Sequence, residues 1–278
     1  MQIEKSVNLS KKTSFGIGGQ AKTIYYPETV VDLLYIPNYS NCLILSGATN
    51  VLVNDTFCGD VISMSKFYTE AIVISGFIKY VKVGAGMRTQ KLVDFLIEER
   101  LTGLEFLLGV PGLVGGAVVM NSGTNGRSIS EFIRSVDVLD EKGNLKTLYK
   151  DLYNDDLKFG RRYSILQEKK YIVLSVTFEL IEDHRYAIRD KTDFYEARRE
   201  DLPKGKSAGG IFINHHILRK YSFDGLSVGD AHLKGNFIIN RGNATAQDVL
   251  NLIKKIRGMV KEKLNLEIKL VGFEGEIK

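Results

Sequence analysis

The chain has 278 residues, of which 44% are hydrophobic, and a formal net charge of +5. This composition predicts a globular protein with a substantial core in two domains, and no apolar run reaches the roughly 18–20 residues of a membrane span. Cys42 and Cys58 fit neither a zinc motif nor a disulfide scaffold. The first residues lack the apolar region of a secretory signal. We expect a cytoplasmic protein with no membrane association, no metal site and two buried thiols.

The first two thirds of the chain alternate short apolar runs with turns, a pattern that predicts strands. These strands are expected at residues 42–46, 51–53, 61–64, 77–83, 135–140, 145–149 and 171–180. A helix is expected to begin after Thr89 as its N-cap, with Leu92, Val93 and Leu96 on one face. Residues 181–205 are highly charged, with a short helix predicted around DFYEARRE, and they mark the expected domain boundary.

The last third of the chain predicts a strand at 236–240, a helix capped by Thr245 with Asp248 completing a capping box, and a strand at 266–271. Residues 205–216, GKSAGGIFINHH, read as a strand entering an active site.

Positive charge is concentrated toward the C-terminus. Residues 185–278 carry 18 Lys and Arg against 12 Asp and Glu, whereas residues 1–184 carry 20 against 21. Such an excess could attract an anionic ligand such as a diphosphate, or it could be a solvated basic surface. No basic run is interleaved with aromatic residues, so the sequence does not favour nucleic-acid binding.

Two glycine-rich stretches have the character of phosphate cradles, namely SGATNVLVND at 46–55 and the run from Gly109 to Gly126. Without a Cβ, successive backbone N–H groups can converge on an anion. Neither stretch is a Walker loop or a Rossmann fingerprint. Tight turning is therefore the alternative interpretation of each stretch taken alone.

Several motifs occur together in order along the chain: TSFGIGGQA, ILSGATNVLVND, VKVGAG, GLEFLLGVPGLVGGAVVMNSG, GRRYS, SAGGIFIN and NATAQDVLNLI. Together they resemble the UDP-N-acetylenolpyruvoylglucosamine reductase family, also called the UDP-N-acetylmuramate dehydrogenase family. The resemblance covers about residues 8–273.

The resemblance implies an α+β fold. A vanillyl-alcohol-oxidase-type FAD-binding domain of two α/β subdomains would span 16–182, after an N-terminal segment at 1–15. A C-terminal α+β substrate-binding domain would span 186–278. By the same resemblance, FAD would be held mainly by backbone groups of the two glycine-rich loops. The residues assigned to FAD are Ser46, Gly47, Ala48, Thr49, Asn50, Val51, Gly109, Val110, Pro111, Gly112, Gly115, Gly116 and Asn121.

The reaction implied by the resemblance has two halves, and it belongs to peptidoglycan precursor synthesis. NADPH reduces FAD, and hydride then passes from the flavin to the vinyl carbon of a UDP-sugar enolpyruvyl ether, which leaves an enolate to be protonated. Arg162 takes the family's arginine position and Ser164 its serine, while Arg161 replaces a tyrosine. A planar bidentate donor suits a carboxylate that becomes an enolate. A plain surface arginine is the alternative for Arg162.

The second catalytic residue by resemblance is Glu267, in EIKLVG, for which an exposed pairing with Lys269 is the alternative. Asn214 matches an asparagine that contacts the substrate. The family's proton-donor serine falls on Gly210, so the usual donor is absent. Ser207 and His215 lie at odd offsets from Gly210, which in a strand would place them on the other face.

The segment at 229–237 also departs from the family pattern. It is shorter by about three residues and lacks the family histidine, although His232 could take its place. Three functions therefore stay open: the NADPH-dependent reductase, a divergent relative that binds FAD or a nucleotide without full activity because of Gly210, and a flavin oxidoreductase with another substrate. The sequence does not determine the oligomeric state.

Overall fold

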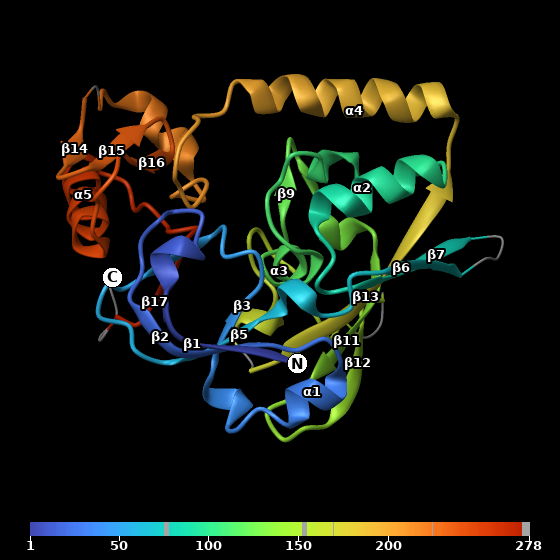
Figure 1. Cartoon of the computed structure of the whole chain (residues 1–278). Coiled ribbons are helices and arrows are strands. Elements are labelled where there is room, and N and C mark those ends of the chain that lie inside the picture. The colour runs from blue at the N-terminus through green and yellow to red at the C-terminus, as the bar shows by residue number, and fades with distance from the viewer. Residues whose placement is uncertain (75–77, 152–154, 169, 224, 274–278) are drawn as a thin grey trace. The chain divides into compact units, whose positions relative to one another are not determined.

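A computed structural model describes residues 1–74, 78–151, 155–168, 170–223 and 225–273 (Figure 1). The chain divides into two compact units, each built from separate stretches. Unit 1 comprises Met1–Ile3, Tyr25–Gly47 and Val61–Leu202, and unit 2 comprises Glu4–Ile24, Ala48–Asp60 and Pro203–Lys278. The domain boundaries at 15–16 and 182–186 stay a prediction.

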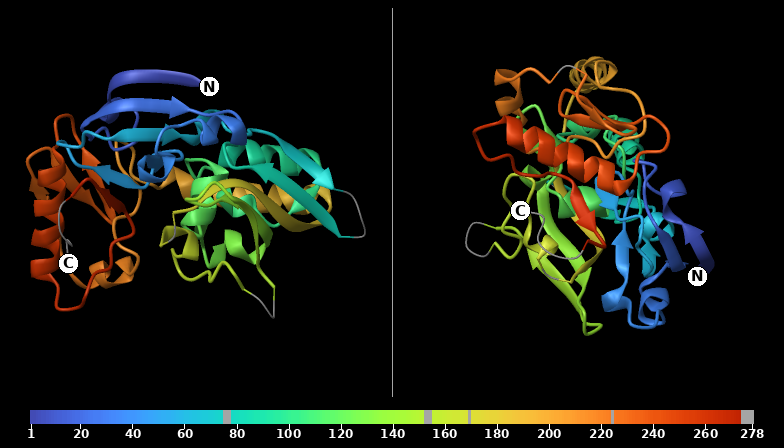
Figure 2. Two further views of the ribbon diagram at one scale, coloured as in Figure 1. Left: turned by 90° about the horizontal axis from the view of Figure 1, so that it is seen from below. Right: turned by 90° about the vertical axis from the view of Figure 1, so that its left-hand side faces the viewer.

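Unit 1 is built on an antiparallel sheet with the strand order β12-β11-β13-β7-β6, and β8 pairs with β13. Its strands are β6 (Ala71–Ile74), β7 (Lys79–Gly84), β8 (Leu101–Thr102), β11 (Ile133–Leu139), β12 (Leu145–Tyr149) and β13 (Ile172–Glu182). Alternation of apolar and polar residues along β11 and β7 buries one face of this sheet in the main core. Figures 1 and 2 show β6 and β7 projecting together beside the long β13.

A second sheet has the order β1-β2-β5-β3, with β3 and β5 parallel. Its strands are β1 (Gln2–Asn8), β2 (Gln20–Tyr26), β3 (Leu43–Leu45) and β5 (Asp60–Ser63). A two-stranded ribbon pairs β9 (Gly123–Thr124) with β10 (Arg127–Ser128).

The helices of unit 1 are α1 (Val30–Leu34), α2 (Thr89–Glu98), α3 (Val114–Val119) and α4 (Arg185–Glu200). Its 3-10 turns are η2 (Tyr39–Asn41), η3 (Met64–Lys66), η4 (Glu105–Leu107), η5 (Ile129–Glu131) and η6 (Ile165–Gln167). Helix α2 packs Leu92, Val93 and Leu96 into the core, as its spacing predicts.

Unit 2 has its own apolar core. Its three-stranded sheet has the order β14-β15-β16, and β17 pairs in parallel with β4. Its elements are η1 (Leu9–Lys11), β4 (Val51–Val53), η7 (His215–Lys220), β14 (Ser227–Val228), β15 (Ala231–Lys234), β16 (Phe237–Asn240), α5 (Ala246–Met259) and β17 (Lys269–Val271). The buried stripe of α5 covers one face of the three-stranded sheet (Figure 1).

Several local predictions are confirmed. Thr245 caps α5, and Asp248 completes the capping box. The strands expected at 51–53 and 145–149 have those bounds, and the hairpin of β11 and β12 turns at Gly143, whose φ is +84°. The strand at 236–240 begins one residue later than expected, because Asn236 belongs to a turn.

Other local predictions are wrong. Arg88, not Thr89, is the N-cap of α2, because the Thr89 hydroxyl donates instead to the carbonyl of Val110. The short helix around 193–200 is the end of the 16-residue α4. Neither thiol is fully buried as expected, because Cys58 is exposed and Cys42 is half-buried. The strand predicted at 77–83 begins at Lys79 among the described residues, and Phe77 lies outside them.

The segment 205–216 is also not a regular strand. It makes single bridges, Lys206 with Asn240, Gly210 with Phe237 and Phe212 with Leu266, and then enters η7 at His215. The left-handed φ of Gly209, +77°, interrupts the pleat between the first two bridges. The offset argument that excluded Ser207 and His215 therefore rests on a regularity that this segment lacks.

Candidate functional site

The two glycine-rich stretches meet within unit 1 at their Ser46 and Gly112 ends. A Cβ on Gly47 would lie 2.4 Å from Cα of Gly112, so the two backbones touch where neither residue has a side chain. The Gly116 N–H donates to Oγ of Ser46 over 3.1 Å. Two segments that are far apart in the sequence thus form one surface made largely of backbone.

Helix α3 follows directly from this contact. The N–H of Gly115 donates to the carbonyl of Ala85 over 3.0 Å, and a Cβ on Gly115 would lie 3.0 Å from Cβ of Ala85. A Cβ on Gly116 would lie 2.7 Å from Oγ of Ser46. These glycines therefore have a packing role, which supports the tight-turn alternative for this part of the loop and leaves their assignment to FAD a prediction.

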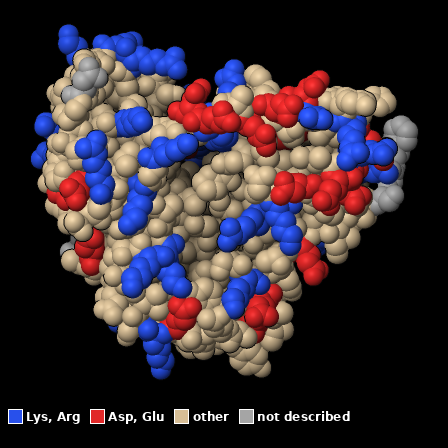
Figure 3. Space-filling model, turned by 45° about the horizontal axis from the view of Figure 1, so that its top comes forward, with Lys and Arg blue, Asp and Glu red and all other residues tan. Residues whose placement is uncertain are grey.

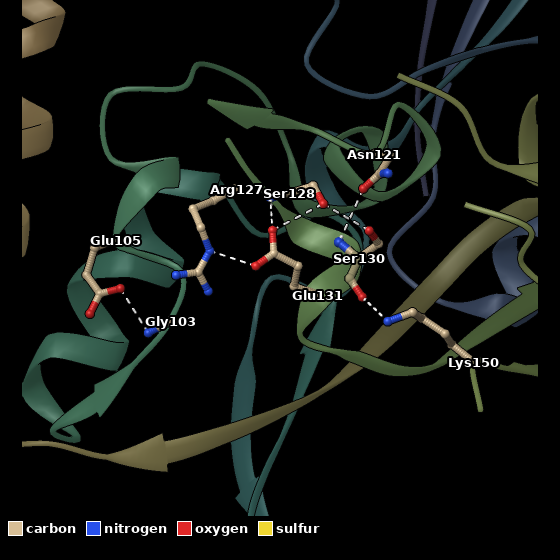
Figure 4. A network of polar contacts seen from close by, with 8 residues as sticks. All are labelled: Gly103, Glu105, Asn121, Arg127, Ser128, Ser130, Glu131 and Lys150. Carbon is tan, nitrogen blue, oxygen red and sulfur yellow. Dashed lines mark hydrogen bonds and ion pairs between the residues drawn. The ribbon is translucent and has the colours of Figure 1, made fainter. Parts of the chain in front are cut away.

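Asn121 anchors the loop that follows α3. Its Oδ1 accepts from the N–H of Ser130 over 3.2 Å, and its Nδ2 donates to the carbonyl of Gly160 over 2.7 Å. Figure 4 shows Asn121 within a polar network that includes Glu131 and Lys150, whose Nζ donates to the carbonyl of Ser130 over 2.6 Å. The buried amide of Asn121 thus joins the loop at Ser130 to the turn at Gly160.

Arg162 occupies a tight turn closed by reciprocal hydrogen bonds between Gly160 and Tyr163. Its φ is +58°, a left-handed conformation that is costly for a residue with a side chain. Its Nη2 donates to the carbonyl of Gly123 over 2.6 Å. Ser164, next in the motif, is fully buried and donates to the carbonyl of Val119 over 2.7 Å. The strained turn and the hydrogen bond to Gly123 together fix the position of the Arg162 side chain within unit 1.

Arg199 is a candidate that the sequence reading missed. Its Nε donates to the carbonyl of Leu108 over 3.0 Å, and a Cβ on Gly109 would lie 3.1 Å from its Cγ. Its Nη2 is buried and has no hydrogen-bond partner in the described part of the chain. Burial lowers the pKa of Arg199, and the charge of Arg162 lowers it further. The Arg-Arg pair at 198–199 was the available signal, but periodicity alone could not distinguish it from a solvated helix end.

Gly210 lies beside Glu267 within unit 2. A Cβ on Gly210 would lie 3.8 Å from Oε2 of Glu267 and 2.8 Å from Nδ2 of Asn236. The backbone of Glu267 is held at both ends, because its N–H donates to the carbonyl of Ile211 over 2.8 Å and its carbonyl accepts from Nδ2 of Asn50 over 3.1 Å. Glu267 precedes β17 rather than lying within a strand, which corrects the predicted strand bounds.

Asn236 fills the space next to Gly210. Its Nδ2 donates to the carbonyl of Phe212 and its Oδ1 accepts from the N–H of Phe212, each over 3.0 Å. Gly235, with φ of +60°, allows the tight turn between β15 and β16 that carries Asn236 there.

The amides of Asn50 and Asn214 are both used inside unit 2. Asn214 donates to the carbonyl of Lys263 over 2.7 Å and accepts from the N–H of Asn265 over 3.0 Å. The substrate contact assigned to Asn214 and the FAD contact assigned to Asn50 stay predictions.

Among the described residues, no group of three or more His, Cys, Asp or Glu side chains is placed to hold a metal ion. No helix in the described ranges is long and apolar enough to cross a membrane.

The residues of unit 1 fit a cofactor that carries anionic and hydrogen-bond-accepting groups. The backbone surface at Gly47 and Gly112 leaves no room for side chains, and Arg199 holds a buried donor that lacks an acceptor. A dinucleotide supplies both an anion and acceptor atoms.

Two family models match the chain. Residues 22–149 match the FAD binding domain, and residues 181–271 match the C-terminal domain of UDP-N-acetylenolpyruvoylglucosamine reductase.

Individual relatives agree with these matches. The UDP-N-acetylenolpyruvoylglucosamine reductase of Caldanaerobacter subterraneus subsp. tengcongensis is 34% identical over 287 residues, which cover 95% of this chain and 92% of the relative. The enzyme of that name from Prochlorococcus marinus is 31% identical and covers 98% of this chain and 99% of its own length. The crystal structure of the reductase from Thermus caldophilus superposes with a TM-score of 0.80 at 30% identity, covering 98% and 99% of the two chains. This chain belongs to the UDP-N-acetylenolpyruvoylglucosamine reductase family, and its fold is the predicted α+β fold with an FAD-binding domain.

Proposed function

We propose that the protein reduces UDP-N-acetylglucosamine enolpyruvate to UDP-N-acetylmuramate, with FAD as its cofactor and NADPH as the reductant. The observation that carries this proposal is the full-length match to reductases of that name, which includes both the FAD-binding and the C-terminal domains. No observation favours a divergent relative without reductase activity or a different flavin reaction.

Bound FAD supplies the hydride chemistry. The residues proposed to hold it are the backbone of Ser46–Val51 and of Gly109–Asn121, with Arg199 added at the Leu108 end. The unpartnered Nη2 of Arg199 supports this addition, because a buried donor without an acceptor costs about 1–3 kcal/mol unless a ligand completes it.

Arg162 is proposed to bind the substrate carboxylate and to stabilise the charge that develops on it. A guanidinium donates two parallel hydrogen bonds to a carboxylate, and charge stabilisation by fixed donors is often the largest contribution to a rate. The left-handed backbone of Arg162 supports a functional role, because strained residues gather at active sites.

Glu267 is proposed to deliver the proton, directly or through a water. A Cβ built on Gly210 would lie 3.8 Å from Oε2 of Glu267. The carboxylate therefore lies next to the position that a proton-donor serine at residue 210 would occupy. An amide N–H is not acidic enough to transfer a proton at neutral pH, so Asn236 can contribute a hydrogen bond and not the proton itself.

The test is NADPH oxidation that depends on the UDP-sugar, with the two half-reactions followed separately by stopped flow. In Arg162→Lys, which keeps the charge and loses the fork, flavin reduction by NADPH should keep its rate, while reoxidation by the enolpyruvyl sugar should slow by roughly 10²-fold or more. Equal reoxidation rates would remove Arg162 from the mechanism. A parent protein that never oxidises NADPH in response to the sugar would overturn the proposed function.

The substrate and NADPH are proposed as the ligands of this protein, within domains at 16–182 and 186–278. A cytoplasmic location is proposed together with these ligands.

A further inference from the structure

The ladder between β4 and β17 ends beside Glu267. At this end Val51 pairs with Lys269, and the N–H of Lys269 donates to the carbonyl of Asn50 over 3.0 Å. Hydrogen bonds between parallel strands recur at every second residue, so the next carbonyl that needs a donor is that of Glu267. The Asn50 side chain supplies this donor, because its Nδ2 donates to the Glu267 carbonyl over 3.1 Å. A side-chain amide thus takes the place of a backbone N–H at the end of the ladder.

The other side of the Glu267 backbone is held by the segment that carries Gly210. The N–H of Glu267 donates to the carbonyl of Ile211 over 2.8 Å, and a Cβ on Gly210 would lie 3.8 Å from Oε2 of Glu267. Glu267 therefore has one backbone hydrogen bond to this segment and one to Asn50. Two such bonds fix the direction in which the side chain leaves the backbone, and a group that transfers a proton must be held to within about 0.5 Å.

A second link joins the same two pieces of chain within unit 2. The N–H of Ser14 donates to the carbonyl of Ala48 over 3.1 Å, and the Ser14 hydroxyl donates to the carbonyl of Ser207 over 2.6 Å. A Cβ on Gly209 would lie 4.0 Å from the carbonyl oxygen of Thr49. The two pieces therefore run side by side, and loss of the Asn50 amide should leave them in contact.

The hold on its backbone, rather than its charge, distinguishes Glu267. Figure 3 shows Asp and Glu side chains at several places on one face of the molecule, so carboxylates as such are common. An exposed carboxylate on a long side chain samples several rotamers and is not aimed at one atom. Glu267 instead is anchored on both sides and lies next to the position where the sequence lacks a serine.

We propose that Asn50 is a positioning residue for the carboxyl group of Glu267. The inference rests on the proposed function, and it leaves the FAD contacts of this stretch to the backbone. In the protonation step one proton passes from the Glu267 carboxyl to the enolate carbon, with a C–H bond forming as the O–H bond breaks. Water then returns a proton to the carboxylate. Because Gly210 has no hydroxyl, a Glu267 side chain that is displaced has no neighbouring serine to replace it.

The test compares Asn50→Ala with Asn54→Ala. Nδ2 of Asn54 donates to the carbonyl of Gly272 over 3.0 Å, at the other end of the same ladder. Oδ1 of Asn54 also accepts from the N–H of Thr56, so its loss should destabilise unit 2 at least as much. The control therefore removes the same kind of hydrogen bond between the same two parts of the chain and does not touch Glu267. If Asn50→Ala fails to fold, Asn50→Asp keeps the shape without the donor, and Asn54→Asp is then its control.

The two half-reactions are followed by stopped flow with FAD at saturation. Flavin reduction by NADPH needs no proton donor and should stay within about twofold of the parent rate in both variants. Reoxidation by the enolpyruvyl sugar should slow roughly 10–10²-fold in Asn50→Ala, because a misplacement of about 1 Å can cost 10²-fold. In Asn54→Ala it should stay within about threefold of the parent rate. Reoxidation of Asn50→Ala should also slow more in D₂O than that of the parent, because proton delivery then limits the rate.

A double-mutant cycle shows whether Asn50 acts through Glu267. In Glu267→Gln the acid is absent, so the further change Asn50→Ala should alter reoxidation by less than about threefold. Additive slowing in the double variant would overturn the inference, because Asn50 would then act independently of Glu267. Equal slowing in Asn54→Ala would also overturn it, because the effect would then be one of stability.

Reoxidation of Asn50→Ala at the parent rate would likewise overturn the inference, and a raised Kd for FAD in that variant would make Asn50 a cofactor ligand. If Glu267→Gln itself reoxidises at the parent rate, the role of Glu267 and this inference fail together, while the proposed function stands. A parent protein that never oxidises NADPH in response to the sugar would instead remove the proposed function.

Discussion

Gly210, Asn236 and Glu267 lie next to one another, so the space that each side chain can occupy depends on the other two residues. The absence of a Cβ at Gly210 leaves room for the Asn236 amide, which clamps the backbone of Phe212. A serine placed at 210 would bring its Cβ within 2.8 Å of Nδ2 of Asn236, closer than such atoms approach in proteins. Restoring a hydroxyl at this position therefore requires the Asn236 side chain to shift, which disturbs its two hydrogen bonds to Phe212.

We expect Gly210→Ser alone to slow reoxidation of the flavin by the sugar, because Asn236 must be displaced. The double variant Gly210→Ser/Asn236→Ala should exceed the single variant by roughly tenfold or more, since a positioned acid is worth about 10²–10⁴-fold and part of it should be recovered. Stopped-flow rates and a four-member mutant cycle measure this coupling. Additive effects of the two changes would show that the residues act independently, and an unaltered rate in Glu267→Gln would remove Glu267 as the proton source.

Arg199 is expected to contribute to cofactor affinity more than to stability. In Arg199→Met, loss of the hydrogen bond to the carbonyl of Leu108 should lower the free energy of unfolding by about 1 kcal/mol. The same change removes the buried Nη2 donor that lacks a hydrogen-bond partner, and this gain offsets the loss. The free energy of unfolding of the FAD-free protein should therefore change by less than about 1 kcal/mol, while the Kd for FAD should rise roughly tenfold. Flavin fluorescence on reconstitution gives the Kd. The exposed Arg189→Met is the control, and equal FAD affinity in both variants would contradict the role of Arg199.

At the scale of elements, Asp137 joins three strands of the unit 1 sheet. From β11 it accepts from Thr147 of β12 and Ser175 of β13, each over 2.7 Å, and pairs with Lys82 of β7 over 2.8 Å. Burial raises the pKa of Asp137, but the hydrogen bonds from Lys82, Ser175 and Thr147 outweigh it, so the pKa lies below its usual range. The ionised carboxylate therefore stabilises the folded state at pH values above the pKa of Asp137 in the unfolded chain, which is about 4. This stabilisation is lost as the pH falls through the lower pKa of Asp137 in the folded protein.

We expect Asp137→Asn to lower the free energy of unfolding by about 1 kcal/mol near pH 7, a figure reduced for partial solvent screening. The difference between parent and variant should shrink as the pH falls below about 4, because protonation removes the same charge from the parent. Denaturant unfolding at several pH values measures it. A difference that is as large at low pH as at neutral pH would contradict the assigned role.

The contact of the two glycine-rich loops is the second feature at this scale. In Gly47→Ala the new Cβ would lie 2.4 Å from Cα of Gly112, and backbone cannot move aside as a flexible side chain can. We expect a loss of about 1–3 kcal/mol in the free energy of unfolding, as for other overpacked sites, together with reduced FAD occupancy.

The matched control for Gly47→Ala is Gly258→Ala near the end of α5. No atom lies within 4 Å of a Cβ built at Gly258, so this change should raise stability by up to about 1 kcal/mol. Thermal unfolding and the flavin absorbance of the purified variants compare the two. A Gly47 variant that is as stable and as yellow as the parent would show that the loops do not meet as described.

At the scale of the whole molecule, the candidate residues are divided between the two units. Unit 1 contains the backbone surface, Arg162 and Arg199, and unit 2 contains Gly210 and Glu267. The basic excess of residues 185–278 lies in unit 2, because residues 185–202 of unit 1 carry 5 Lys and Arg against 5 Asp and Glu, whereas residues 203–278 carry 13 against 7. Summing charge along the sequence therefore locates the basic excess in one of the two units.

The sequence alone determined the family, the cofactor class, the α+β fold and the start of α5, because these depend on ordered motifs and on local rules such as the Thr245 capping box. It did not determine that Gly47 meets Gly112, that Arg199 lies against Leu108, or that Asn236 occupies the space beside Gly210. These contacts join residues 26 to 91 positions apart, and spacing along a chain carries no information on such distant neighbours. Only packing brings them together, and packing also decided that 205–216 forms single bridges instead of a strand.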